Sequence, residues 1–168
     1  MKSVKKLTML ALLTTIALTI FVLESAVPPL VPIPGVKLGL ANIVTLVLIS
    51  AQMPREAAAV LFARVFLASV FAGQMMSFFF SLLGGLFCLI AMYVSNRLLK
   101  GQLLWFTSII GAIFHNAGQL LAAIITLQST YVIYYAPFLL VSGIITGIFT
   151  GLAAGFFTRR IDIRKFFR

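Results

Sequence analysis

The chain has 168 residues, of which 62% are apolar and 10% are charged, and its 13 Lys and Arg residues against 3 Asp and Glu residues give a formal net charge of +10. Soluble domains carry about 45–50% apolar and about 25% charged residues, so this composition excludes a water-soluble fold. On such a chain a basic excess faces anionic lipid headgroups and sets the orientation in the membrane, rather than binding nucleic acid. The composition predicts one small integral membrane domain over residues 1–168, in contact with the lipid bilayer.

The acidic residues are too few and too scattered for metal-assisted or phosphoryl chemistry. Only Glu24, Glu56 and Asp162 are acidic, whereas magnesium sites for prenyl diphosphates or nucleotides need clustered carboxylates. No glycine-rich loop ends in Gly-Lys-Ser/Thr, so the chain has no ATPase motor of its own. The single histidine, His115, and the single cysteine, Cys88, exclude a two-histidine haem site, a zinc site and an internal disulfide. We therefore expect a protein that is not an enzyme and holds no metal or cofactor.

Six apolar runs lie between polar breaks, and the second is the shortest. Crossing a hydrocarbon core of about 30 Å takes about 20 helical residues. The first run could be a secretory signal peptide, but it lacks a convincing small-residue cleavage site and five more runs follow, so we interpret it as a helix. The sequence thus predicts an all-α, six-span membrane protein with spans at Leu7–Val27, Leu38–Met53, Arg55–Ala72, Phe78–Leu99, Leu103–Leu127 and Ala136–Phe157.

The basic residues predict the orientation of these spans. The connections at 28–37, 73–77 and 128–135 hold only Lys37, and Arg64 lies inside a span. By the positive-inside rule, both termini are expected in the cytoplasm. The residues expected on the cytoplasmic side are Lys2, Lys5, Lys6, Arg55, Arg97, Lys100, Arg159, Arg160, Arg164, Lys165 and Arg168.

Small residues recur at helical spacing in three of the spans. Such strips let another helix backbone approach closely, so each is a candidate helix–helix interface, within this bundle or with another protein. The strips are Gly143, Gly147, Gly151 and Gly155 in the sixth span, Ala11, Thr15 and Thr19 in the first, and Ser77, Ser81 and Gly85 in the fourth.

The loop between the first two spans is rich in proline. Four of the eight residues from Pro28 to Gly35 are prolines, which excludes a helix and favours extended backbone. The loop is also too apolar to extend freely into water. We interpret it either as a stiff flap over the outer mouth of the bundle or as a rigid connector without ligand contact.

Arg64 is an ionisable residue inside a span, where charge is costly. It follows Arg55 by nine residues, which places it about 13 Å deep, near the midplane. Two roles are open. Arg64 either pairs with a backbone carbonyl or with Glu24, or it forms the floor of a cavity that receives an anionic or strongly hydrogen-bonding group.

The fifth span carries polar residues that share one helical turn, at His115, Asn116 and Gln119. They are either satisfied core residues or part of a binding site. Other polar residues fall at a similar outer depth on segments distant in sequence, which predicts a pocket that opens outward. The ligand stays open between a vitamin, a quinone head group and a prenyl phosphate. The candidate ligand-binding residues are Glu24, Lys37, Asn42, Arg64, His115, Asn116 and Gln119.

The motifs in this order resemble the Gx transporter family, which is also labelled heptaprenyl diphosphate synthase component I. The resemblance covers nearly the whole chain. It is carried by Leu23-Glu24, the proline loop, Lys37-Leu38-Gly39-Leu40-Ala41-Asn42-Ile43-Val44, Ala63-Arg64-Val65, Ser81-Leu82-Leu83-Gly84-Gly85, His115-Asn116-Ala117-Gly118-Gln119 and the glycine strip of the sixth span.

The resemblance implies a six-helix fold similar to the substrate-binding S components of energy-coupling factor transporters. Those proteins capture vitamins or related small molecules, and a separate transmembrane coupling protein with two ATPases drives transport. S components dock the coupling protein through an Ala-x-x-x-Ala strip on the first helix, whereas the matching strip here reads Ala11, Thr15 and Thr19. The leading interpretation is a protein of the bacterial cytoplasmic membrane that captures a small amphipathic ligand from the outer side.

Two alternatives remain from the same resemblance. One is a membrane subunit of flavin- or quinone-linked extracellular electron transfer. The chain lacks a motif for covalent flavin attachment, so a flavin or quinone would bind noncovalently or on a partner. The other is a membrane accessory of polyprenyl diphosphate synthesis, although the scattered acidic residues argue against synthase chemistry in this chain.

Overall fold

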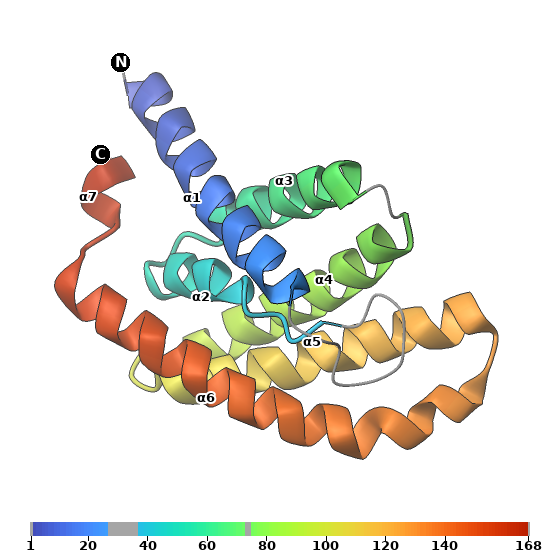
Figure 1. Cartoon of the computed structure of the whole chain (residues 1–168). Coiled ribbons are helices and arrows are strands. Elements are labelled where there is room, and N and C mark those ends of the chain that lie inside the picture. The colour runs from blue at the N-terminus through green and yellow to red at the C-terminus, as the bar shows by residue number, and fades with distance from the viewer. Residues whose placement is uncertain (1, 27–36, 73–74, 168) are drawn as a thin grey trace.

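The structure is a computed structural model that describes residues 2–26, 37–72 and 75–167, and every regular element in these ranges is helical. The predicted all-α class is confirmed. The elements are α1 (Lys2–Ser25), α2 (Asn42–Ser50), α3 (Pro54–Ala72), α4 (Met75–Leu98), α5 (Leu104–Leu127), the 3₁₀-helix η1 (Thr130–Tyr135), α6 (Ala136–Arg160) and α7 (Arg164–Phe167) (Figure 1). The predicted proline flap at 28–35 lies outside the described residues.

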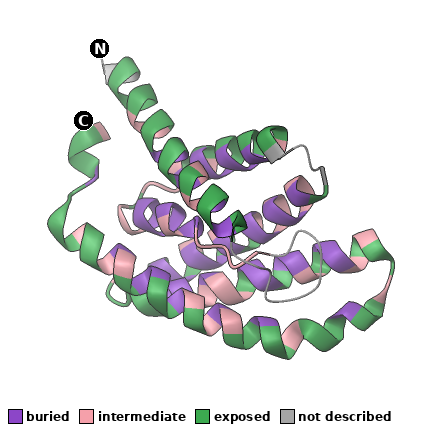
Figure 2. Ribbon diagram, viewed as in Figure 1, coloured by how far each residue is buried: buried purple, intermediate pink, exposed green. Residues whose placement is uncertain are grey.

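Four helical segments are long and apolar enough to cross a membrane: Val4–Ser25, Met76–Leu98, Leu104–Leu127 and Thr130–Arg160. Their outward faces carry large exposed apolar side chains, such as Phe149 on α6, and Figure 2 shows exposed residues along much of the outer helices. Apolar surface on this scale is unfavourable in water, whereas a helix that satisfies its own backbone hydrogen bonds suits hydrocarbon. The architecture is that of a membrane-embedded protein.

The second predicted span is shorter than expected. Helix α2 begins at Asn42 rather than Leu38, because Gly39 adopts a left-handed backbone conformation with φ of 79° and starts a turn instead of a helix. The helix has 9 residues and is therefore about 13 Å long, less than half of a hydrocarbon core. It cannot cross a membrane by itself.

The third predicted span has the expected length, but it carries a charged residue near its middle, Arg64, as well as two at its start. Helix α3 has 19 residues, and Arg55, Glu56 and Arg64 all lie on it. This charge separates α3 from the four apolar spans, although its bounds agree with the prediction to within one residue.

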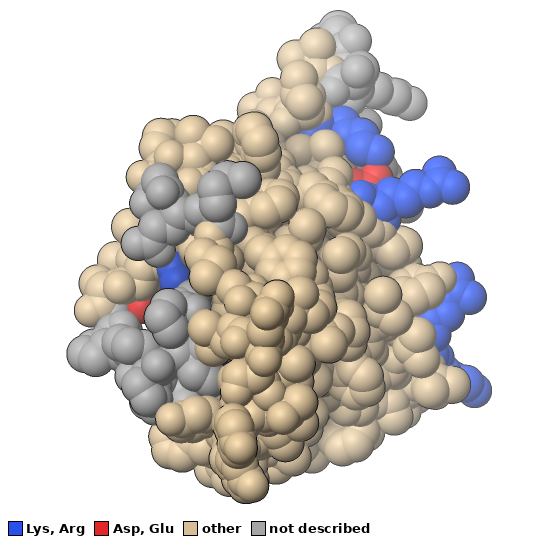
Figure 3. Space-filling model, turned by 90° about the vertical axis from the view of Figure 1, so that its right-hand side faces the viewer, with Lys and Arg blue, Asp and Glu red and all other residues tan. Residues whose placement is uncertain are grey.

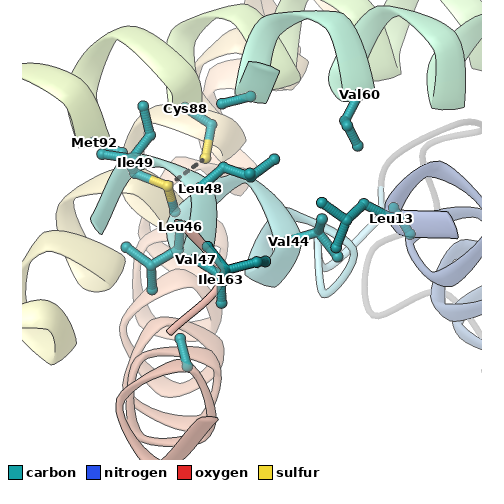
Figure 4. Close-up of a cluster of buried hydrophobic side chains, with 13 residues drawn as sticks. Leu13, Val44, Leu46, Val47, Leu48, Ile49, Val60, Cys88, Met92 and Ile163 are labelled. Carbon is teal, nitrogen blue, oxygen red and sulfur yellow. Dashed lines mark hydrogen bonds between the residues drawn. The ribbon is translucent and has the colours of Figure 1, made fainter. Parts of the chain in front are cut away.

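Helix α2 forms the centre of the bundle rather than part of its wall. Leu46 and Leu48 are fully buried, and α2 contacts α1, α3, α4, α5 and α6. Figure 4 shows Leu13, Val60, Met92 and other apolar side chains around it. A helix that is apolar on all sides can be either a membrane span or a buried core helix. The sequence of α2 therefore resembles a span, although the helix lies in the core of the bundle.

The glycine strip of α6 packs mainly within the bundle. A Cβ atom at Gly147 would lie 2.6 Å from the Cα of Ile109, and one at Gly151 would lie 2.5 Å from the Cα of Trp105, both on α5. Gly155, by contrast, has nothing within 4 Å of such an atom. The in-bundle interpretation is therefore confirmed for this strip except at its last glycine.

The other two strips differ from each other. On α4, Ser77 and Ser81 are buried, and a Cβ at Gly85 would lie 2.6 Å from the side chain of Leu61 on α3. On α1, Ala11, Thr15 and Thr19 are exposed, and the two threonine hydroxyls donate to carbonyls four residues earlier. The strip on α1 therefore faces outward, whereas the strip on α4 faces the bundle.

Most basic residues meet at one end of the bundle. Lys6 on α1 pairs with Glu56 on α3 at 2.6 Å, Asn96 of α4 donates to the carbonyl of Ile49, and Arg164 donates to the carbonyl of Ala51 at 2.8 Å. These contacts join the start of α1, the α2–α3 junction, the end of α4 and the C-terminal segment. Figure 3 shows most of the visible Lys and Arg atoms along one edge of a mostly uncharged face.

We predict that Gly147→Ala and Gly151→Ala each lower the stability of the protein in mild detergent by about 1–3 kcal/mol, because the added methyl group meets α5 backbone. Gly155→Ala is the matched control on the same strip. It should be neutral or stabilising by up to about 1 kcal/mol, because alanine favours a helix over glycine. Thermal unfolding of the three variants tests this, and equal melting temperatures would contradict the assigned packing.

Candidate functional site

The structure places all seven predicted site residues in one region inside the bundle. We call this set the polar cluster; its members are Glu24, Lys37, Asn42, Arg64, His115, Asn116 and Gln119. All are buried except the half-buried Lys37. They come from α1, the segment before α2, α2, α3 and α5. Hydrogen bonds link Lys37, Asn42, Arg64, His115 and Gln119 into one chain.

Asn42 joins the arginine to the histidine. The Arg64 guanidinium donates to Asn42 Oδ1 at 3.3 Å, which leaves the Asn42 amide nitrogen to face His115 Nδ1 at 3.1 Å. Because an amide nitrogen only donates, Nδ1 is the acceptor. His115 is therefore assigned as the neutral tautomer with its proton on Nε2.

Gln119 continues the chain outward. Both atoms of its amide are satisfied when the nitrogen donates to the Lys37 carbonyl at 2.9 Å and the oxygen accepts from His115 Nε2 at 3.2 Å and from the Lys37 amide at 3.1 Å. Each link of the chain, from Arg64 to the backbone of Lys37, then pairs a donor with an acceptor. In a low-dielectric interior the hydrogen bonds of such a chain polarise and strengthen one another, which favours a single arrangement of the side chains.

Glu24 holds the turn that precedes α2 by hydrogen bonds to its backbone. Its two carboxylate oxygens accept from the backbone amides of Gly39 at 2.7 Å and Leu40 at 2.9 Å. Arg64 lies near enough to be attracted to this carboxylate, yet no ion pair within 4.0 Å joins the two described side chains. Of the two structural partners expected for Arg64, Glu24 is thus engaged elsewhere, and Asn42 takes the contact instead.

Lys37 lies at the edge of the polar cluster. Its ammonium donates to the Ser25 hydroxyl at 2.5 Å and lies 3.5 Å from the centre of the Phe21 ring. Lys37 therefore ties the segment before α2 to the end of α1.

Two glycines make room for the imidazole. A Cβ at Gly39 would lie 2.7 Å from His115 Cδ2, and one at Gly84 on α4 would lie 2.8 Å from His115 Cε1. The ring therefore sits between the turn before α2 and the face of α4. Sequence reasoning placed both glycines in family motifs but gave them no role, because nothing local signals a contact with a histidine far along the chain.

Asn116 points away from the rest of the polar cluster. Its amide nitrogen donates to the carbonyl of Leu139 at 2.6 Å, and a Cβ at Gly143 would lie 2.9 Å from that nitrogen. Asn116 thus joins α5 to α6, although the sequence groups it with His115.

A small cavity adjoins the polar cluster at Asn42 and Gly39. Its volume of about 10 Å³ holds about one water molecule. The cavity is lined by Leu38, Gly39, Asn42, Cys88, Met92, Ser108, Ala112, Thr146 and Thr150. Ser108 and Thr150 are hydrogen-bonded at 2.8 Å. The sequence analysis did not identify these hydroxyl residues. Thr146 and Thr150 could have been found from their position, because each directly precedes a glycine of the α6 strip.

The chemistry available here is recognition by hydrogen bonds and charge. Among the described residues, no three His, Cys, Asp or Glu side chains lie close enough together to hold a metal ion. The polar cluster offers a guanidinium, an imidazole, an ammonium and amides to a ligand that displaces some of their mutual contacts.

We predict that Gly84→Ala destabilises the protein by about 1–3 kcal/mol, because its methyl group overlaps the His115 ring. In a His115→Ala background the same change should cost much less, because the ring is gone. A double-mutant cycle by thermal unfolding tests this contact. Equal costs of Gly84→Ala in the two backgrounds would mean that the ring does not lie against α4.

The comparisons with known proteins give one match. A family model described as heptaprenyl diphosphate synthase component I matches residues 13–157. No curated protein and no solved structure matches the chain. The matched range includes every residue of the polar cluster.

Proposed function

This chain belongs to the heptaprenyl diphosphate synthase component I family, and on that premise we propose that it is a non-enzymatic membrane protein that binds and transports a small molecule. In this proposal it captures a small amphipathic ligand from the outer side of the bacterial cytoplasmic membrane. It then passes the ligand inward with partner proteins, as the resemblance to S components implies.

The polar cluster is the observation that carries the proposal. Charged and strongly polar groups inside a membrane bundle are costly and are normally retained where they serve a ligand or ion. Here Arg64 and Glu24 are 4% and 5% exposed. A bundle that needed only stability would gain as much from apolar packing at these positions. The polar cluster therefore supports a binding role more directly than any other feature.

The proposed topology has six crossing segments with both termini in the cytoplasm. The segment from Lys37 through α2 crosses as a unit, and α3 crosses with Arg64 inside the bundle and Arg55 at the basic end. The positive-inside rule supports this orientation, because the basic end contains the starts of α1 and α3 and the ends of α4 and α6. The polar cluster then lies between the membrane centre and the outer side.

The proposed binding cycle requires the turn before α2 to move. Glu24 holds this turn at Gly39 and Leu40, Gln119 holds Lys37, and the adjoining cavity is as small as a water molecule. We take this arrangement to be the closed form. Breaking the two hydrogen bonds from Gly39 and Leu40 to Glu24 would let the turn move and expose Asn42 and His115 together, which gives a ligand access to both.

Energy for transport would come from outside the chain, through a transmembrane coupling protein with ATPases. The absence of a nucleotide-binding motif in the sequence supports a need for such partners. A second candidate, a membrane accessory of polyprenyl diphosphate synthesis, is favoured by the family's description. In that role too, the chain would hold a ligand rather than carry the synthase chemistry.

The topology is tested by single cysteines in a Cys88→Ala background. We predict that a cysteine at Ser129 reacts with a membrane-impermeant maleimide added to intact cells, while cysteines at Gln102 and Lys100 react only after the cells are opened. Labelling of the Lys100 site from outside would contradict the six-span topology.

The binding role is tested on protein purified in mild detergent. Mass spectrometry should identify a retained small molecule: a vitamin-like compound supports the proposal, a prenyl diphosphate the second candidate, and a menaquinone or flavin an electron-transfer role. Isotherms with that compound should then show weaker binding to Arg64→Gln and Asn42→Leu, by about 1–3 kcal/mol for each buried hydrogen bond lost. Arg55→Gln, which removes a charge from the same helix outside the polar cluster, is the matched control. Unchanged affinity in folded Arg64→Gln and Asn42→Leu would remove these two residues from the site.

A further inference from the structure

We infer that the ligand of the polar cluster is an anion, with a carboxylate or phosphate group that Arg64 binds and Lys37 attracts. This inference rests on the proposed function and names the chemical class of its ligand. It follows from the charge of the polar cluster, from the partners of Glu24 and from the hydrogen bonds of Arg64.

The polar cluster carries more positive than negative charge, and no other acidic residue of this chain is placed to correct the difference. It contains two cations, Lys37 and Arg64, and one carboxylate, Glu24. The whole chain has only two other acidic residues. Of these, Glu56 pairs with Lys6 at the basic end, and Asp162 lies between α6 and α7.

The carboxylate of Glu24 is engaged by backbone amides. One oxygen accepts from Gly39 at 2.7 Å and the other from Leu40 at 2.9 Å, so both oxygens hold the turn before α2. No ion pair within 4.0 Å joins Glu24 to Arg64 or to Lys37. A protonated Glu24 would only increase the positive excess.

Most N–H donors of Arg64 have no hydrogen-bond acceptor among the described residues. A guanidinium presents five N–H groups in a planar fork, and the described contacts supply one hydrogen bond, at 3.3 Å to the neutral amide of Asn42. The fork matches the two oxygens of a carboxylate or phosphate. Because the side chain is 4% exposed, an anion placed beside it would be poorly screened and strongly attracted.

The other two charge classes fit poorly. A cationic ligand would meet two like charges at close range. A neutral ligand would leave the guanidinium charge inside the bundle without a counter-ion in contact, which keeps the desolvation cost of that charge uncompensated. An amphipathic anion supplies the counter-ion and places its apolar part among the apolar side chains of the bundle.

The test uses four probes that share one chain length: hexanoate, hexyl phosphate, hexanol and hexylammonium. Each is titrated into the full-length protein in a neutral maltoside detergent, and binding is followed by the melting temperature and by calorimetry. Arg64→Gln removes the charge, Arg64→Lys keeps it without the fork, and Arg55→Gln is the control for general charge effects. The two anions distinguish a carboxylate ligand from a phosphate ligand.

We expect at least one anion to bind and to raise the melting temperature, and hexanol and hexylammonium not to do so. Binding of that anion should weaken at least tenfold in Arg64→Gln, less in Arg64→Lys, and not in Arg55→Gln. The inference is overturned if hexanol binds as well as the anions, if neither anion binds, or if anion binding survives Arg64→Gln. A retained neutral compound that depends on Asn42 would overturn this inference alone, whereas the absence of any retained or bound compound would count against the proposed function itself.

Discussion

The interior of this bundle depends on one chain of hydrogen bonds that runs from Arg64 through Asn42, His115 and Gln119 to the backbone of Lys37. Hydrocarbon offers these groups no hydrogen-bond partners, so the links of the chain are made within the protein. The order of donors and acceptors fixes the tautomer of His115, and the ring in turn fixes the spacing between the turn before α2 and helix α4. The polar chain thereby connects segments that lie far apart in the sequence.

Close backbone approach makes this chain geometrically feasible. Gly84 lets α4 approach the His115 ring, while Gly118 on α5 packs against the backbone of α4 at Leu83. Gly147 and Gly151 of α6 likewise let the backbones of α6 and α5 approach closely. Without a hydrophobic driving force between helices in lipid, such contacts are a main source of helix association. Packing by small residues and hydrogen bonding by polar residues therefore both stabilise the association of α4, α5 and α6.

The distribution of charge links this packing to the proposed function. Most basic residues lie at one end of the bundle, while Lys37 and Arg64 are kept apart from them in the polar cluster. Because Glu24 is bonded to the turn before α2, it holds that turn in place and does not neutralise Arg64 by contact. In the proposed function, one carboxylate thus both keeps the site closed and leaves it positively charged. This combination suits a site whose ligand supplies the missing negative charge when the turn moves.

The sequence by itself determined the membrane class, the all-helical fold, five of the six predicted spans as long helices with bounds within five residues, and the polar residues that avoid lipid. These follow from composition and local periodicity, which report how far each residue tolerates hydrocarbon. The tertiary structure alone decided that α2 is a short central helix, that Gly39 and Gly84 enclose His115, that Glu24 binds backbone amides, and that Asn116 turns to α6. The physical reason is that each of these contacts joins residues far apart in the chain. A residue's own sequence neighbourhood says that it needs a partner but not which partner it meets.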